Sequence, residues 1–290
     1  MEYRRYSDAA DFLEGAEKFF MEHESKYGLP YGLSLSLKRY PERIQQELYF
    51  AAIWEGTQPL LLAMMTPPHN LILAAEDPQM LGVFHLLARS LLPLGLPIPG
   101  LIGPKPIVAQ FAPIWCKIAE GQAEVSSSLR CYELRQVIPP QPPPGKLRMA
   151  YAEDIPLLAG WMRAFNAETR QDGFPQDFIP IVAQKVEDGD YYLWVVGGVP
   201  VCLVGKGRPT RTGTNIGPVY TPLQFRKQGY ASAAVAAVSQ HLLDSGRKFI
   251  TLFTNLSNPI ANHIYQEVGF HPVCDFDEIH FAYLGKDQSV

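Results

Sequence analysis

The stretch Gly217-Pro-Val-Tyr-Thr-Pro-Leu-Gln-Phe-Arg-Lys-Gln-Gly-Tyr-Ala231 decides the fold of this chain. Its composition predicts a β-strand that ends at Tyr220-Thr221, a sharp loop, and a helix that opens at Gly229. The first N–H groups of such a helix lack partners within it, and the positive end of the helix dipole lies behind them. Arg226 and Lys227 add two cations, and Gly229 lets the backbone approach a ligand closely. The stretch therefore predicts a binding site for a pyrophosphate-bearing ligand.

Two segments carry a resemblance to a known family. The pattern Arg226-x-x-Gly229-x-Ala231 resembles the acyl-CoA loop of the GNAT N-acetyltransferase superfamily, in the branch similar to glycine N-acyltransferases. Downstream, Asn258-Pro-x-x-x-x-x-Tyr265-x-x-x-Gly269-Phe270 resembles the second CoA-contacting segment of that superfamily. The resemblance implies an α+β fold with a mixed, mostly antiparallel central sheet flanked by helices. It also implies an enzyme, an N-acetyltransferase that moves an acetyl group from acetyl-CoA to a primary amine of a small molecule or amino acid.

The resemblance implies roles for particular residues. Tyr265 would be the general acid that protonates the departing CoA thiolate, and backbone N–H groups at Val219 and Tyr220 would polarise the thioester carbonyl. Asn255 would orient a water molecule, and the amine would attack directly in a ternary complex. Catalysis is therefore expected from Tyr265, Val219 and Asn255. Contacts to acetyl-CoA are expected from Val219, Tyr220, Thr221, Arg226, Lys227, Gln228, Gly229, Tyr230, Ala231, Asn255, Asn258, Asn262 and Tyr265.

The general base and the acceptor stay open. The strand from Thr214 to Thr221 carries no carboxylate, so the base is either relayed by water or comes from the final strands. The candidates there are Asp275, Asp277, Glu278 and His280, each of which is also a common kind of solvated turn residue. Four aromatic residues either line an acceptor cleft or belong to the core: Trp161, Phe165, Trp194 and Phe253. Arg208 and Arg211 either meet an acceptor carboxylate or are plain surface charges.

The chain of 290 residues is long enough for two domains. Five prolines in the eight residues Ile138–Gly145 predict a linker at 138–145, between an N-terminal α/β domain (1–137) and an acetyltransferase domain (146–290). The N-terminal domain is either a degenerate copy of the same fold or an unrelated α/β cap. It has the acidic Glu76-Asp-Pro-Gln79 where a copy would need its phosphate loop, so we expect no CoA there. Its expected role is either to form one side of an acceptor cleft or to bind a second subunit. The second role would make the protein a homodimer.

Composition excludes several other classes. A content of 47% apolar and 19% charged residues is that of a globular protein, and a net charge of −4 argues against nucleic-acid binding. No apolar run is long enough for a membrane span, and the polar start of the chain lacks a signal-peptide core. Four widely spaced cysteines predict free thiols and a cytoplasmic protein, and the histidines lack metal spacing, so no metal is expected. Two alternatives remain: a non-catalytic CoA-binding sensor or interaction module, and a protein or peptide N-acetyltransferase.

Overall fold

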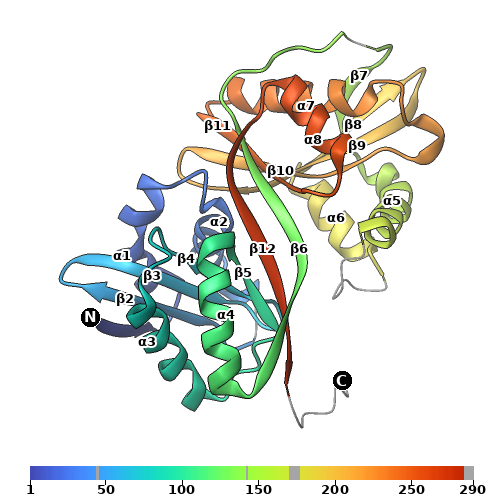
Figure 1. Cartoon of the computed structure of the whole chain (residues 1–290). Helices are drawn as coiled ribbons and strands as arrows, with labels where there is room; N and C mark the ends of the chain where they lie inside the picture. The colour runs from blue at the N-terminus through green and yellow to red at the C-terminus, as the bar shows by residue number, and fades with distance from the viewer. Residues whose placement is uncertain (44–45, 142, 170–176, 284–290) are drawn as a thin grey trace. The chain divides into compact units, whose positions relative to one another are not determined.

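The chain forms two compact units in a computed structural model that describes residues 1–43, 46–141, 143–169 and 177–283 (Figure 1). Unit 1 consists of Met1–Cys131, Phe253–Ser257 and the chain from Pro272 onward. Unit 2 consists of Tyr132–Leu252 and Asn258–His271. This division differs from the expected domains, because residues 272–283, expected in the C-terminal domain, lie in unit 1. Within the described residues, every helix is too short or too polar to cross a bilayer.

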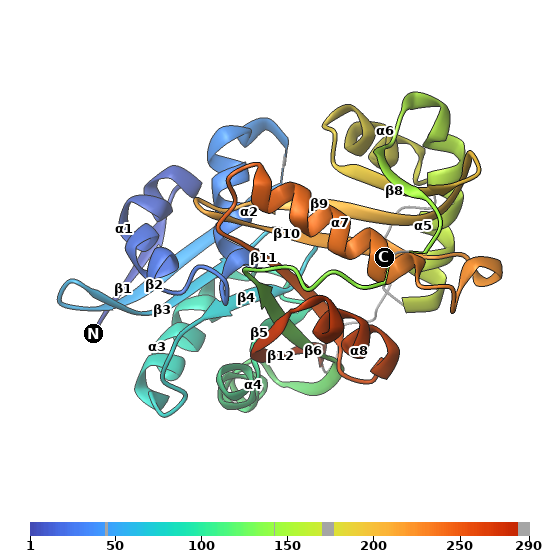
Figure 2. The same ribbon diagram turned by 90° about the horizontal axis from the view of Figure 1, so that it is seen from above.

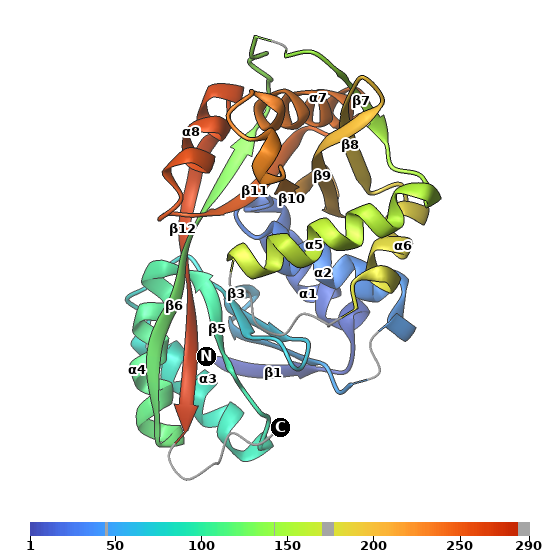
Figure 3. The same cartoon turned by 90° about the vertical axis from the view of Figure 1, so that its right-hand side faces the viewer.

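Unit 2 holds a mixed sheet between two pairs of helices. The strands that form it are β7 (Lys146–Met149), β8 (Tyr191–Val196), β9 (Val199–Pro209), β10 (Gly213–Tyr220) and β11 (Phe249–Asn255), joined by the end of β6. The helices are α5 (Ile155–Thr169), α6 (Ile179–Glu187), α7 (Tyr230–Asp244) and α8 (Pro259–Val268), with short 3-10 turns η3 (Ala152–Asp154) and η4 (Leu223–Phe225). Strands β7 to β10 pair antiparallel, whereas β10 and β11 are parallel. Helices α5 and α6 cover one face and α7 and α8 the other, each over its own hydrophobic cluster (Figure 3).

Unit 1 has the same layers. Its strands are β1 (Glu2–Tyr6), β2 (Tyr49–Glu55), β3 (Gln58–Met65), β4 (Leu71–Ala74), β5 (Gly100–Pro104), β12 (His271–Tyr283) and most of β6 (Gly121–Leu134). Its helices are α1 (Ala9–Glu22), α2 (Gly28–Arg39), α3 (Leu81–Leu91) and α4 (Lys105–Ala119), with 3-10 turns η1 (Pro41–Arg43) and η2 (Leu92–Leu94). Figure 2 shows α1 and α2 on one side of these strands and α3 and α4 on the other, in agreement with two separate buried clusters.

The two halves of the sequence repeat one order of elements and exchange their last strands. Both halves run β-α-α-β-β-β-α-β-α-β, from β1 to β6 and from β7 to β12. The final strand β12 pairs antiparallel with β5 of unit 1, where Phe276 faces Pro104 and His280 faces Gly100. The end of β6, Tyr132–Leu134, belongs instead to unit 2, in which β6 neighbours β11. Each unit is therefore completed by a segment from the other half of the chain.

Some predicted elements are wrong. The sequence around residues 40–46 also predicts a helix, but in the described part of that range the turn η1 follows α2. The sequence after Phe270 predicts two strands, and the structure has the single strand β12 there. Strands β1 and β5 were not predicted. Strand β1 is a charged edge strand and β5 reads Gly-Leu-Ile-Gly-Pro, and neither composition favours a strand by itself.

Candidate functional site

The parallel strands β10 and β11 are paired over a short stretch only. Their ladder joins Gly213–Asn215 to Phe249–Thr251, while β10 continues to Tyr220. Along its other edge, β10 stays paired with β9, where Val219 faces Val204 and Tyr220 faces Leu203. The backbone of Val219 and Tyr220 therefore has one edge that lies beyond the paired part of the β10–β11 ladder. This is the strand end at which the sequence analysis expects the thioester of acetyl-CoA.

Beyond the strand, the loop leads into a helix whose N-terminus is open. Gly229 is the N-cap residue of α7, with a φ of 78°, and because it has no side chain it gives the first N–H groups of the helix no side-chain cap. Arg226, Lys227, Gln228 and Gly229 are all exposed, and Lys227 also has a positive φ of 60°. The orphan N–H groups and the helix dipole thus face solvent at the expected anion cradle. The predicted strand, loop and helix are confirmed in place and order.

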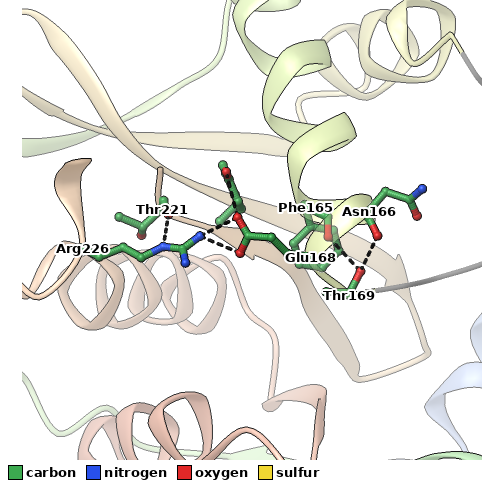
Figure 4. A network of polar contacts seen from close by, with 7 residues as sticks. Phe165, Asn166, Glu168, Thr169, Thr221 and Arg226 are labelled. Atoms are coloured by element: carbon green, nitrogen blue, oxygen red, sulfur yellow. Dashed lines mark hydrogen bonds and ion pairs between the residues drawn. The ribbon is translucent and has the colours of Figure 1, made fainter. Parts of the chain in front are cut away.

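The Arg226 side chain does not lie at this N-terminus. Its Nε donates to the Thr221 carbonyl oxygen at 2.8 Å, and its Nη2 donates to both carboxylate oxygens of Glu168 at 2.8 and 2.7 Å (Figure 4). Its guanidinium carbon also lies 5.8 Å from the centre of the Tyr220 ring. In the free protein, Arg226 therefore ties the loop to α5, and a contact with phosphate stays a prediction. Gln228 is likewise engaged locally, since it donates to the Gln224 carbonyl oxygen and accepts from the Tyr230 hydroxyl.

The three asparagines expected near the ligand all have partners within the protein. Asn258 caps α8 as predicted, with its Oδ1 accepting from the Ala261 N–H at 3.0 Å. Asn262 accepts from the Tyr132 hydroxyl at 2.9 Å and donates to the Asn258 carbonyl oxygen at 2.7 Å. Asn255 belongs to unit 1, where it donates to Ser127 and accepts from Ser257. The structure thus gives Asn255 a role in a turn, and its role in orienting a water molecule stays a prediction.

Tyr265 is the buried titratable group of the site. It is 8% exposed and lies in the core cluster of unit 2, with ring centres 6.4 Å from Tyr132 and 5.9 Å from Phe270. Burial, and then the nearby Cys202 thiol, raise the pKa of Tyr265 above its ordinary value. Burial also raises the pKa of Cys202 to about 12. Both groups therefore hold their protons at neutral pH, so Tyr265 is a proton donor and Cys202 is not a thiolate nucleophile.

The carboxylates proposed as a base all lie on β12 in unit 1, and they have structural partners. Asp275 accepts two hydrogen bonds from Arg130, Asp277 accepts from Ser128 at 2.6 Å, and Glu278 accepts from Asn70 at 2.8 Å. His280 belongs to the same strand and faces Gly100. These four residues therefore belong to unit 1, and a base from the final strands stays a prediction.

The aromatic candidates separate into different environments. Trp161 and Phe165 lie against Tyr220, with ring centres 6.1 and 6.4 Å away. Trp194 is buried and donates to the Pro144 carbonyl oxygen at 3.0 Å, and Phe253 packs on Phe276 in unit 1. The two arginine candidates, Arg208 and Arg211, are both exposed. Among the four aromatic candidates, all of them described residues, Trp161 and Phe165 are therefore the two that contact the end of β10.

Glu168 is the site residue that the sequence did not reveal. It lies in the last turn of α5, where it accepts from Arg226 and, at 3.4 Å, from the Tyr220 hydroxyl. Burial, followed by the charge of Glu168, raises the pKa of Tyr220. Sequence separation hid this contact, because Glu168 and Arg226 are 58 positions apart in the sequence. Only the packing of α5 along β10 brings the two together.

Unit 1 has a different arrangement at the corresponding positions. Helix α4 follows β5 directly, and Phe111 stands seven positions after its N-cap Pro104, as Tyr265 stands seven positions after Asn258. A Cβ added at Gly103 would lie 2.8 Å from the Leu73 carbonyl oxygen, so β5 stays close to β4. At the position that corresponds to Tyr265, unit 1 thus has Phe111, which carries no hydroxyl group. Its strands β4 and β5 lie close together.

The acidic loop of unit 1 is also closed by internal contacts. Glu76 accepts from Lys26 Nζ at 2.8 Å and from the Tyr27 hydroxyl at 2.7 Å. Partial burial works against ionisation of Glu76, but the hydrogen bonds from Lys26 and Tyr27 outweigh it and lower its pKa. A carboxylate that stays charged beside the start of α3 repels phosphate. Both this loop and the closed strands argue against a CoA site in unit 1.

Comparison with known proteins agrees with this geometry. The family model described as FR47-like protein matches residues 204–277, which run from β9 into β12 and include the whole loop and Tyr265. No curated protein sequence matches the chain.

Solved structures similar to this chain share its architecture. A GNAT-family acetyltransferase from Colwellia psychrerythraea is 11% identical, with 98% of this chain and 100% of that one covered and a TM-score of 0.61. A GCN5-related N-acetyltransferase from Sphaerobacter thermophilus is 15% identical, with 99% and 97% covered and a TM-score of 0.60. A tandem GNAT protein from the clavulanic acid biosynthesis pathway is 11% identical, with 99% of both chains covered and a TM-score of 0.57.

These matches show the fold of the chain. It is the α+β acyl-CoA N-acyltransferase fold of the GNAT superfamily, with a mixed, mostly antiparallel sheet flanked by helices, as the sequence predicted. The match along the whole tandem GNAT protein agrees with the repeated order of elements in the two halves. The narrower likeness to glycine N-acyltransferases stays a prediction.

Proposed function

We propose that this protein is an N-acetyltransferase that uses acetyl-CoA as its donor and a primary amine of a small molecule or amino acid as its acceptor. The observation that carries the proposal is the open N-terminus of α7 next to the strand end where β10 runs on past its ladder with β11. The FR47-like match spans this segment, and the fold is one that binds acyl-CoA.

The donor would be held mainly by the backbone. The orphan N–H groups of α7 and the exposed Lys227 supply positive charge to a pyrophosphate, and Gly229 permits close approach. The fit is chemical as well as geometric, because the loop from Thr221 to Ala231 contains no carboxylate. One such site per chain is proposed, in unit 2.

Tyr265 is proposed as the acid of the reaction. The amine nitrogen attacks the thioester carbonyl carbon, the C–S bond breaks, and the departing thiolate takes a proton from the Tyr265 hydroxyl. The N–H groups at Val219 and Tyr220 stabilise charge on the carbonyl oxygen. A raised pKa keeps Tyr265 protonated before the thiolate leaves, and direct attack requires no acyl-enzyme. The amine loses its extra proton to solvent through water.

One observation favours a second candidate, a CoA-binding module without turnover. Strand β10 carries no carboxylate, and the carboxylates of β12 are engaged in unit 1. The retained phenol of Tyr265 favours the enzyme, since binding alone does not require a leaving-group acid.

The experiment that separates the two candidates measures release of free CoA thiol from acetyl-CoA, with a panel of primary amines. An N-acetyltransferase releases thiol at a rate that rises with the concentration of at least one amine, and mass spectrometry finds the matching amide. Binding of acetyl-CoA without amine-dependent release from any member of the panel would favour the module.

A further inference from the structure

The Arg226 guanidinium is shared between two parts of unit 2 in the free protein. Nε is bonded to the Thr221 carbonyl oxygen in the loop, and Nη2 is bonded to the Glu168 carboxylate on α5. Figure 4 shows the two side chains pointing toward one another from these elements. The Glu168 carboxylate thus pairs with the Arg226 guanidinium, the cation that the loop would otherwise offer to a phosphate.

This ion pair is open to exchange. The side chains of Arg226 and Glu168 are 37% and 42% exposed, and such solvated pairs contribute little net free energy. A pyrophosphate offers more negative charge than one carboxylate and accepts from a guanidinium through two parallel hydrogen bonds. It would also lie at the positive end of the α7 dipole, which favours it further. A bound pyrophosphate therefore competes well for Arg226.

The surroundings of Glu168 suit a second cation. The Tyr220 ring already lies beneath a positive charge, with the Arg226 guanidinium carbon 5.8 Å from its centre. The Tyr220 hydroxyl bonds to Glu168, and Trp161 and Phe165 pack against the same ring. A carboxylate beside an aromatic face is an arrangement that binds an organic ammonium group.

We propose that Glu168 holds Arg226 until the CoA pyrophosphate takes that guanidinium, and that the freed carboxylate then binds the ammonium group of the amine acceptor. The inference rests on the proposed function and deepens it by naming an acceptor-binding residue. It makes donor binding favour acceptor binding, and linkage requires the reverse effect to be equal in size. Glu168 thereby selects acceptors that arrive as cations, and the bound ammonium group gives one proton to water before its nitrogen attacks the thioester.

The first test is a double-mutant cycle on CoA affinity, measured by calorimetry with the full-length protein, Glu168→Gln, Arg226→Gln and the double variant. Removing the competing carboxylate is expected to tighten CoA binding about two- to fivefold, the size expected for an exposed ion pair. Arg226→Gln is expected to weaken CoA binding, and Glu168→Gln is expected to have no further effect in that background. The exposed Glu187 on α6 supplies a matched control, Glu187→Gln, which removes the same charge elsewhere in unit 2.

The sign of the change separates the proposal from a purely structural role. If Glu168 only supports the loop, Glu168→Gln weakens CoA binding, and that result, or an unchanged affinity, overturns the proposal. Wild-type protein that binds no CoA would overturn the proposed function as well. Wild-type binding with the wrong sign in Glu168→Gln would overturn this inference alone.

The second test uses benzylammonium chloride as the cationic probe and benzyl alcohol as its neutral match. CoA-saturated wild-type protein is expected to bind the cation at least about fivefold more tightly than CoA-free protein does, and Glu168→Gln is expected to lose that gain. Arg226→Gln is expected to bind the cation without CoA, because its Glu168 is already free. Equal binding of the cation by Glu168→Gln, or no preference over the alcohol, contradicts the assignment of an ammonium site.

Discussion

Tyr265 joins the packing of unit 2 to its proposed chemistry. Its ring fills core space against Tyr132 and Phe270, and its burial raises the pKa of the phenol. The same environment that stabilises the fold thus keeps a proton available for a departing thiolate. A phenol in water has a pKa of about 10 and a thiol about 8.5, so complete transfer of the proton to a free thiolate is uphill by about 2 kcal/mol, and the phenol aids departure through its hydrogen bond to the sulfur as the C–S bond breaks.

Replacement of Tyr265 by Phe keeps the ring and removes the proton donor. We expect kcat for acetyl transfer to fall by roughly 100-fold, the lower end of the range for general acid catalysis, while CoA affinity changes little. Steady-state kinetics and calorimetry on the same preparation measure both quantities. Tyr132→Phe, which removes a hydroxyl bonded to Asn262, is the control for loss of a buried phenol. An unchanged kcat in Tyr265→Phe would remove the assigned role.

The pH dependence of the rate follows from the direction of the same shift. Because the folded-state pKa of Tyr265 lies above its ordinary value, the acid stays protonated as pH rises toward about 10. We therefore expect that ionisation of Tyr265 causes no decline in kcat between pH 7 and 9.5. The pH profiles of wild type and Tyr265→Phe should then have the same shape in that range. A descending limb near pH 8 that is lost in the variant would show that the phenol ionises far below this prediction.

Individual site residues were predictable only where their role is local. The helix start at Asn258 and the helix start at Gly229 follow from neighbours in sequence, and both are confirmed. The partner of Arg226 was not predictable, because Glu168 reaches it through the packing of a separate helix. Asn255 was expected in the site for its position after a strand, yet its turn contacts place it in unit 1.

At the scale of elements, the start of α7 carries the anion-binding claim. Gly229→Asp places a carboxylate where the proposal puts a pyrophosphate, so we expect CoA affinity to fall at least about tenfold. Gly246→Asp adds the same charge at another left-handed glycine, beyond the opposite end of α7. Both substitutions are expected to cost about 1 kcal/mol of unfolding free energy, because a side chain is strained at positive φ. Equal CoA affinity in the two variants would contradict the cradle.

The entry to α5 depends on one partly buried ion pair. Asp154 accepts from Arg148 through both oxygens and from the Tyr151 N–H at 2.8 Å, and the hydrogen bonds from Arg148, the largest influence, lower the pKa of Asp154. Asp154→Asn is expected to reduce the free energy of unfolding at pH 7 by about 1–3 kcal/mol. A lowered folded-state pKa gives stability that is full above the unfolded value of about 3.9 and is lost as pH falls through the folded value.

Urea denaturation at a series of pH values measures this contribution. The difference between wild type and Asp154→Asn is expected to shrink as pH falls below about 4, where the carboxylate is protonated in the unfolded chain and then in the folded one. Asp244→Asn, on an exposed turn of α7, is the matched control and is expected to change stability by less than about 0.5 kcal/mol. A difference in the free energy of unfolding between wild type and Asp154→Asn that stays constant down to pH 2.5 would show that the charge of Asp154 is not the cause of the stabilisation.

Most elements of the C-terminal half follow from periodicity, whereas the sheet edges do not. The alternating and helical residue patterns from Lys146 to Val268 are enough to predict each helix and strand that the structure has in the described part of that range. The exchange of β6 and β12 left no local signal, since a strand's sequence does not say which neighbour completes it. Long-range pairing therefore decided the part of the fold that the sequence did not predict.

At the scale of the whole molecule, the exchanged strands make each half of the chain incomplete. A fragment of residues 1–137 lacks β12 and leaves β5 without its antiparallel neighbour, and the fragment 138–290 lacks Tyr132–Leu134 of β6. We expect neither fragment to unfold cooperatively alone, and the co-expressed fragments to recover a single cooperative transition. Thermal melts followed by circular dichroism check this. A cooperative melt of fragment 1–137 alone would contradict the exchange.

The central claim is one acetyl-CoA site per chain, formed in unit 2 by the open end of α7. Calorimetric titration of the full-length protein with acetyl-CoA measures affinity and stoichiometry together. We predict one site per chain, with its affinity lowered at least about tenfold in Gly229→Asp and retained in Gly246→Asp. Two sites per chain would show that unit 1 also binds acetyl-CoA despite its acidic loop. No binding by the wild-type protein would contradict the acetyltransferase account itself.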